Sequence, residues 1–232
     1  MPWPDHLDDY CERVSPAFWA EPVNALSNAV FLLAAVLLWR AQRRAGPPVP
    51  VDLTVLTGLM ATIGVGSFVF HTLATRWSQG LDVAPIGLFV CCYLAAYFHW
   101  FWQWRWRRAG LAVLGFATFC GVTAAGFGSH SLNGSLPYLP VLATLAGLTV
   151  ALARSADPER AEHWPAFASA AILFAGALVF RSVDTGICAW FPLGTHFLWH
   201  LLNGAVLFVL GRALTRRWRQ VTSRTGSGPG PA

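Results

Sequence analysis

Residues 65–82 read VGSFVFHTLATRWSQGLD and place Ser67, His71 and Asp82 inside or at the edge of apolar runs. Polar ionisable side chains are costly at membrane depth, and where they occur there they mark function. The apolar sequence on either side is long enough for two membrane helices joined by a short turn. This stretch therefore predicts a helical membrane protein with a polar site inside its bundle.

The composition of the whole chain agrees with this interpretation. Of the 232 residues, 55% are hydrophobic and 12% are charged, and the mean hydropathy is +0.49. Such a chain has too little polar surface to coat a soluble globule of this size. Membrane topology explains the net charge of +5 better than nucleic-acid binding does. All 16 basic residues are arginine, which favours a GC-rich bacterial genome.

Seven apolar segments approach the length of about 20 residues that a membrane helix needs. They are residues 24–40, 51–75, 81–102, 109–128, 136–153, 164–185 and 194–214. The predicted fold class is thus an all-α membrane protein, a seven-transmembrane helix bundle over residues 24–218. An acidic extracytoplasmic segment (1–23) precedes the bundle, and a disordered cytoplasmic tail (219–232) follows it. The acidic start is unlike a cleavable signal peptide, so the first helix is expected to direct insertion.

The arginines predict the orientation of the bundle. The loops after the first, third and fifth helices, together with the C-terminal end, hold Arg40, Arg43, Arg44, Arg105, Arg107, Arg108, Arg154, Arg160, Arg212, Arg216, Arg217, Arg219 and Arg224. Only Arg13 and Arg76 lie on the opposite side, and Arg181 lies within the sixth helix. The positive-inside rule then places the N-terminus outside and the C-terminus in the cytoplasm. A multi-pass protein of the bacterial inner membrane is expected.

This topology brings four ionisable residues to one depth. His71 lies near the outer end of the second helix, and Asp82 begins the third from the same side. His196 and His200 lie in the first two turns of the seventh helix, also at its outer end. At 1.5 Å rise per residue, all four lie within roughly 10 Å of the extracytoplasmic boundary. We therefore expect them to meet there.

The meeting residues have the chemistry of a zinc hydrolase. His196 and His200 are spaced i, i+4, so both imidazoles share one helical face and can bind one metal ion with His71. Three neutral histidines and an open position are typical of catalytic zinc. Asp82 can receive the proton of a water, and Ser67 can hydrogen-bond the oxyanion formed at a substrate carbonyl. The alternative is that the histidines only make hydrogen bonds between helices.

The remaining histidines fall in or near loops and at helix ends, where no special role is expected. They are His6, His99, His130 and His163.

Six short motifs, in this order along the chain, resemble the alkaline ceramidase family. They are DYCE (9–12), EPVNALSN (21–28), GSFVFH (66–71), QGLDVAP (79–85), RSVDTGIC (181–188) and HFLWHLLNG (196–204). This family belongs to a superfamily of seven-helix membrane hydrolases that includes the adipoQ-type receptors. The resemblance implies zinc held by His71, His196 and His200, with Ser67 and Asp82 in the catalytic positions. It also implies a lipid substrate: these enzymes cleave the amide bond of ceramides, releasing a fatty acid and a sphingoid base.

The resemblance further implies a calcium site in the N-terminal segment. Asp9, Glu12 and Glu21 match its acidic positions, and Tyr10 would supply a backbone carbonyl; hard cations take such oxygen ligands. This chain departs from the family pattern, however. Val14 stands where the family has an oxygen-bearing asparagine, and the stretch before Glu21 is two residues shorter. A solvated acidic face without calcium is the alternative.

Two further pairs are expected near the outer end of the bundle. The resemblance pairs Cys11 with Cys188, and both lie on the outer side, where a disulfide can persist. Arg181 and Asp184 are spaced i, i+3 and are expected to form a structural ion pair within the bundle.

Three functions compete at this point. The favoured one is a zinc-dependent amidase for ceramide or a related N-acyl lipid, which makes a membrane lipid and the bilayer its partners. The second is a non-catalytic seven-helix receptor or sensor with structural zinc. The third is a serine lipid hydrolase based on Ser67, although the chain lacks a G-x-S-x-G elbow. No protein partner can be assigned from the sequence.

Overall fold

The computed structural model describes residues 5–44, 48–127 and 131–226, and most of these residues are helical. His130 and residues 227–232 of the expected tail lie outside them. The elements are α1 (Pro22–Ser27), α2 (Ala29–Arg43), α3 (Val51–Leu73), α4 (Arg76–Trp102), α5 (Trp106–Phe127), α6 (Ser131–Gly134), η1 (Leu136–Tyr138), α7 (Leu139–Ala153), α8 (Pro158–Ala161), α9 (Trp164–Val183), η2 (Asp184–Gly186) and α10 (His196–Gly226).

Seven helical spans in the described residues are long and apolar enough to cross a membrane, which confirms the predicted fold class. The first span, Pro22–Arg43, joins α1 and α2, and the sixth, Pro158–Gly186, joins α8, α9 and η2. Length and apolarity do not show which end faces the cytoplasm, so the orientation stays a prediction.

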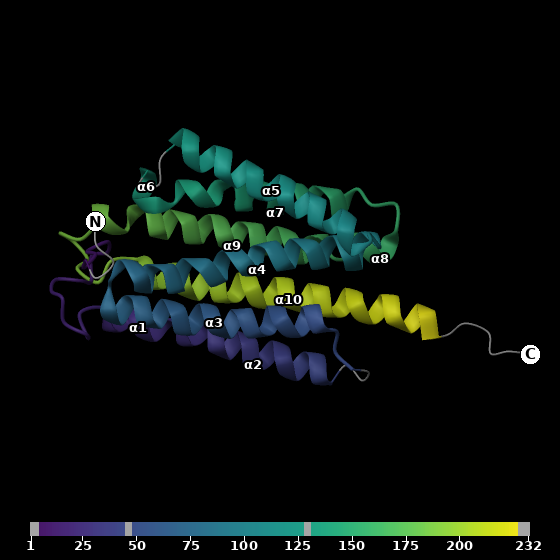
Figure 1. Ribbon diagram of the computed structural model, residues 1–232, viewed down its shortest axis with the longest axis horizontal. Coiled ribbons are helices and arrows are strands. Elements are labelled where there is room, and N and C mark those ends of the chain that lie inside the picture. Colours follow the sequence, from purple (N-terminus) through teal and green to yellow (C-terminus); the bar gives the residue numbers. More distant parts are fainter. Residues whose placement is uncertain (1–4, 45–47, 128–130, 227–232) are drawn as a thin grey trace, which may run out of the picture.

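The spans form one bundle in which α10 lies near the middle and α3 lies between α4 and α2 (Figure 1). Helix α3 packs against α2 and α4, and α10 packs against α2 and α9. Helix α5 lies at the periphery of the bundle: only 6% of its apolar stretch is buried, compared with 50% of that of α3. The two helices that carry the predicted histidines are therefore the most buried of the seven described spans, with 50% of the apolar stretch buried in α3 and 44% in α10.

Helix α4 begins five residues before the start predicted at residue 81. Thr75 and Ser78 form a capping box, in which each side chain bonds the backbone N–H of the other's residue. Such a box satisfies donors at a helix start that would otherwise lack partners, so the helix can begin inside a polar stretch. Asp82 consequently lies in the second turn of α4 and not at its first residue.

Helix α10 runs to Gly226, so the tail predicted to be disordered from residue 219 is helical at its start. Its 31 residues span roughly 46 Å, more than the hydrocarbon core of about 30 Å. Contacts with the α8 region hold the extension. Trp218 is buried, and Arg217 pairs with Glu159 at 3.1 Å and with Asp157 at 3.6 Å.

The N-terminal segment packs against the end of the bundle where α4 and α10 begin (Figure 1). A disulfide joins Cys11 to Cys188, as the resemblance implied. The backbone N–H of Leu7 donates to the carbonyl of Ala74, at the end of α3. The described ends of the chain lie at opposite ends of the bundle (Figure 1). Segment and bundle are thus tied together beside the predicted site.

Candidate metal centre

Three histidines meet at the end of the bundle that the N-terminal segment covers. His71 is in the last turn of α3, and His196 and His200 are in the first two turns of α10. All three are buried, and one potential ligand atom from each lies within 4.8 Å of the other two. In the part of the chain that the structure describes, no other group of three or more histidine, cysteine or acidic residues converges in this way.

The hydrogen bonds of these histidines fit a bound metal ion. Nδ1 of His71 lies 2.6 Å from Oε2 of Glu21, and Nδ1 of His200 lies 2.7 Å from the hydroxyl of Ser27. Nε2 of His71 and Nδ1 of His196 are buried without a hydrogen-bond partner. Metal-binding histidines commonly bond an outer partner through one nitrogen and leave the other for the metal. A buried polar atom with no partner is costly, so the donor set fits a cation between the rings.

Asp184 holds the start of α10 in place. Its Oδ1 accepts the backbone N–H groups of Thr195 at 2.5 Å and His196 at 2.9 Å, and its Oδ2 accepts that of Cys11 at 3.0 Å. Gly194 has a φ of +63°, and a Cβ there would lie 2.2 Å from the Asp184 carboxylate. Only glycine allows this approach without strain. A carboxylate at a helix N-terminus thus fixes the first turn, which carries His196.

The expected ion pair between Arg181 and Asp184 does not form. The backbone at Asp184 is still helical, but its carboxylate accepts the backbone N–H groups of Cys11, Thr195 and His196 instead of the guanidinium of Arg181. The guanidinium of Arg181 instead donates to the hydroxyl of Tyr10 at 2.8 Å. It also lies over three aromatic rings, those of Tyr10, Tyr138 and Trp199, at 5.3–5.7 Å. Both residues have partners, but not each other.

Ser67 and Asp82 face one another where α3 and α4 touch. A Cβ on Gly66 would lie 2.1 Å from the carbonyl oxygen of Leu81, so the two backbones are in contact at this point. The Ser67 hydroxyl is within hydrogen-bonding reach of the Asp82 carboxylate. Ser67 is one helical turn from His71 on α3. The serine and the carboxylate therefore lie beside the three histidines.

Replacing Gly66 with alanine tests this close contact. The added methyl group must push α3 away from α4, and overpacking of this kind costs about 1–3 kcal/mol. We expect a lower melting temperature. We also expect a large loss of the predicted amide hydrolysis, because Ser67 and Asp82 would separate. The matched control is Gly58→Ala on the same helix, where a Cβ would meet nothing within 4 Å. Equal melting temperatures and equal rates of hydrolysis for the two variants would contradict the close contact of α3 with α4 at Gly66.

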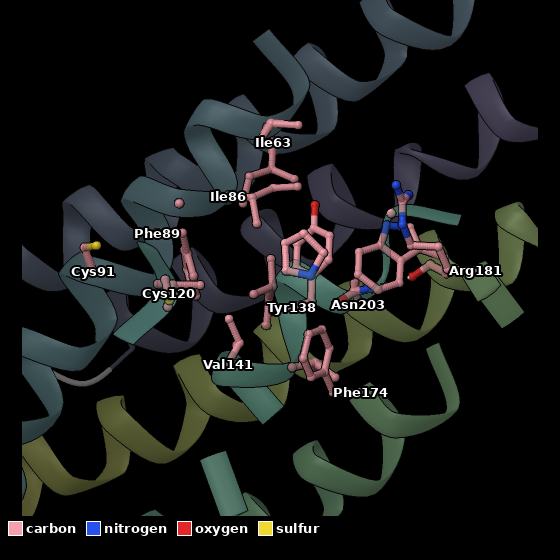
Figure 2. Close-up of a pocket in the computed structure, with 18 of the residues that line it drawn as sticks. Ile63, Ile86, Phe89, Cys91, Cys120, Tyr138, Val141, Phe174, Arg181 and Asn203 are labelled. Atoms are coloured by element: carbon pink, nitrogen blue, oxygen red, sulfur yellow. Dashed lines mark hydrogen bonds between the residues drawn. The ribbon is translucent and has the colours of Figure 1, made fainter. Parts of the chain in front are cut away.

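A cavity of about 800 Å³ lies beside the histidines, lined mostly by apolar residues of α4, α5, α7 and α10. In Figure 2, Arg181 and Asn203 lie toward one end of the labelled lining, and Cys91 and Cys120 lie at the other. Two lining residues also contact the metal centre: the ring of Tyr10 stacks on His196 at 3.6 Å between centroids, and that of Phe31 lies 6.3 Å from His200. The cavity can thus hold a long apolar group next to the histidines.

The residues expected to bind calcium have other partners. Glu12 accepts the backbone N–H groups of Val23 and Asn24 at 2.7 and 2.8 Å, and so caps the start of α1. The carbonyl of Tyr10 accepts the N–H of Arg13 at 3.2 Å, and Asp9 lies 3.4 Å from the amide of Gln79.

Glu21 is the most engaged of these carboxylates. It accepts hydrogen bonds from Arg13, Asn24 and His71. Burial by itself would raise the pKa of Glu21, but these hydrogen bonds hold the pKa below its usual value. Glu21 is therefore an anion that orients a histidine.

Sequence reasoning missed the outer partners of the histidines. Ser27 and Glu21 both fall within the EPVNALSN motif, but nothing in their spacing points to His200 or His71. The stacking of Tyr10 on His196 was equally hidden, because the two residues are far apart in the sequence. The conspicuous EPVNALSN motif was the only available signal.

The match to known families agrees with this geometry. The family model described as Ceramidase matches residues 7–225, which include all three histidines and both Ser67 and Asp82. Comparison with curated protein sequences gives no significant match. A match over most of the chain, on a seven-span bundle with a buried three-histidine group, establishes the relationship. The chain belongs to the ceramidase family.

Proposed function

We propose that this protein is a zinc-dependent amidase that cleaves ceramide or a related N-acyl lipid into a fatty acid and an amine, the sphingoid base in the case of ceramide. Membership of the ceramidase family implies a hydrolase that acts on lipid amide bonds. The observation that carries the proposal is the buried three-histidine group with two unpartnered nitrogens, next to a carboxylate and an apolar cavity.

The metal would supply Lewis acidity and a water acidic enough to react near neutral pH. The protein's own residues do the rest. Asp82 accepts the proton of the attacking water and can return it to the leaving amine. Ser67 donates a hydrogen bond to the carbonyl oxygen as negative charge develops there. Glu21 and Ser27 hold the rings of His71 and His200 in one orientation.

The cavity supports a lipid substrate. An acyl chain can lie along its apolar walls, with the amide near Tyr10 and the histidines. Nε of Arg181 is buried without a hydrogen-bond partner and lies at the polar end of the cavity (Figure 2). It is therefore available to donate to an oxygen of the substrate's polar part.

The arginine distribution supports a site on the extracytoplasmic side. The three histidines lie at the end of the bundle opposite the arginine-rich C-terminal half of α10 (Figure 1). By the positive-inside rule, that arginine-rich end is cytoplasmic. We therefore propose an inner-membrane enzyme whose substrate enters from the outer leaflet.

Metal analysis combined with a lipid panel tests this function. We expect the purified protein to contain one zinc ion per chain and to release fatty acid from ceramides or other N-acyl lipids. Removal of zinc with a chelator should abolish the release, and added zinc should restore it.

The contrary outcomes distinguish the alternatives. Hydrolysis that persists in the zinc-free protein would indicate a serine hydrolase. Bound zinc without hydrolysis of any N-acyl lipid would favour a receptor or sensor with structural zinc.

A further inference from the structure

Arg13 is a buried cation in the N-terminal segment. Only 5% of the residue is exposed, although an arginine is almost never buried unless its charge is paired. It follows Glu12 directly and precedes Val14, whose side chain is 87% exposed and points away from the bundle. The chain therefore directs a positive charge inward at this position.

Four oxygen atoms surround the guanidinium of Arg13. Its Nε donates to Oε1 of Glu21 at 2.5 Å, and Nη2 donates to the carbonyl of His71 at 3.0 Å. Its Nη1 donates to the carbonyls of Ser15 at 3.0 Å and Ala17 at 3.5 Å. One carboxylate and three backbone carbonyls are the kind of ligands that a hard cation takes. Here a guanidinium occupies the space among them.

The calcium ligands that the resemblance implied do not fit a calcium ion in this chain. Both oxygens of Glu12 cap α1, and both oxygens of Glu21 are bonded to Arg13, Asn24 and His71. The carbonyl of Tyr10 accepts a backbone N–H. A calcium ion bound by Glu21 would lie beside the guanidinium of Arg13, whose Nε is 2.5 Å from Oε1 of that residue, and the two positive charges would repel each other.

We propose that Arg13 replaces calcium as the cation that ties the N-terminal segment to the metal centre, so that this protein needs no calcium. Arg13 acts as a positioning residue by two routes. It bonds the backbone carbonyl of His71 directly, and it neutralises Glu21, which in turn orients the imidazole of His71. A covalently attached cation keeps this link without regard to the calcium concentration outside the cell.

The test measures stability and metal content, so it does not depend on the proposed lipid activity. Full-length protein in detergent is passed over a chelating resin, and calcium and zinc are measured by emission spectrometry. Melting temperatures are then recorded with and without millimolar calcium. For the wild type we expect no bound calcium and no shift on adding calcium. Stoichiometric calcium, or a rise in the melting temperature, would overturn the proposal.

Arg13→Ala gives the complementary result. Removing one partner of a buried ion pair should lower the melting temperature by roughly 5–15 °C. Because the four oxygens then lack a cation, calcium should raise the melting temperature of this variant but not that of the wild type. The control is Arg44→Ala, an exposed arginine at the other end of the bundle.

Two results with this variant would count against the proposal. One is a wild-type melting temperature, and the other is a destabilised protein that calcium does not restore. If Arg13→Ala does not fold, Arg13→Lys serves instead. It keeps the charge but not the forked donors, and it should melt between the wild type and the calcium-free alanine variant.

Discussion

Replacement of His196 by alanine is expected to remove the metal and the lipid hydrolysis together. The change takes one of three buried ligands from a site in which the potential ligand atoms lie within 4.8 Å of one another. Loss of an outer hydrogen-bond partner alone costs about 10- to 100-fold in metal affinity, so loss of a ligand should cost more than about 100-fold. Zinc content and fatty-acid release, measured on the same preparation, check this result.

His99→Ala is the matched control for this variant. His99 lies at the other end of the bundle, where it bonds the carbonyl of Trp104 and stacks on Trp106. We expect it to keep both zinc and activity. A His196→Ala protein that retains stoichiometric zinc would show that the histidines do not hold the metal, and the proposed mechanism would fail with them.

Replacement of Asp82 by asparagine should separate chemistry from metal binding. Asparagine keeps the size of the side chain but cannot accept a proton, and loss of a general base typically costs about 100- to 10,000-fold in rate. The three histidines are untouched, so zinc should remain. We therefore expect a folded, zinc-loaded protein whose rate of fatty-acid release is lower by that factor.

Asp52→Asn controls for the loss of a carboxylate in a membrane helix. Asp52 lies at the opposite end of α3 and accepts a hydrogen bond from Trp100 at 2.7 Å. The Asp52→Asn variant should retain nearly the full rate of fatty-acid release. Two results with Asp82→Asn would exclude the proton-transfer role: an unchanged rate, or a loss of zinc as large as that in His196→Ala, which would make Asp82 a ligand.

Several elements of the fold could be predicted from local sequence alone. A membrane span requires only a run of apolar residues of sufficient length, so composition along the chain was enough to predict seven spans. The boundaries were less certain. Helix α4 begins early because Thr75 and Ser78 cap it. Helix α10 extends because Trp218 is buried in the core and Arg217 pairs with Glu159 of α8. The first depends on local side-chain geometry, and the second on a contact between distant segments.

The grouping of the histidines was also predictable, because depth in a membrane follows from position along a helix. His71, His196 and His200 had to share one depth once the helices were placed, and the structure brings them together. Their sideways distance depends on helix packing, which the sequence does not state. Gly66 shows the difference: its place in the GSFVFH motif is plain, but its backbone contact with Leu81 appears only in the fold.

By itself, the sequence determined the number of spans, the residue types at the site and their common depth, because each depends on local chemistry and helical rise. Only the tertiary structure decided the partners. Asp184 caps α10 and does not pair with Arg181; Glu21 orients His71; and the guanidinium of Arg13 lies among four oxygens. Hydrogen bonds between residues far apart in the chain depend on how the helices pack, and the spacing of residues along one helix does not determine that packing.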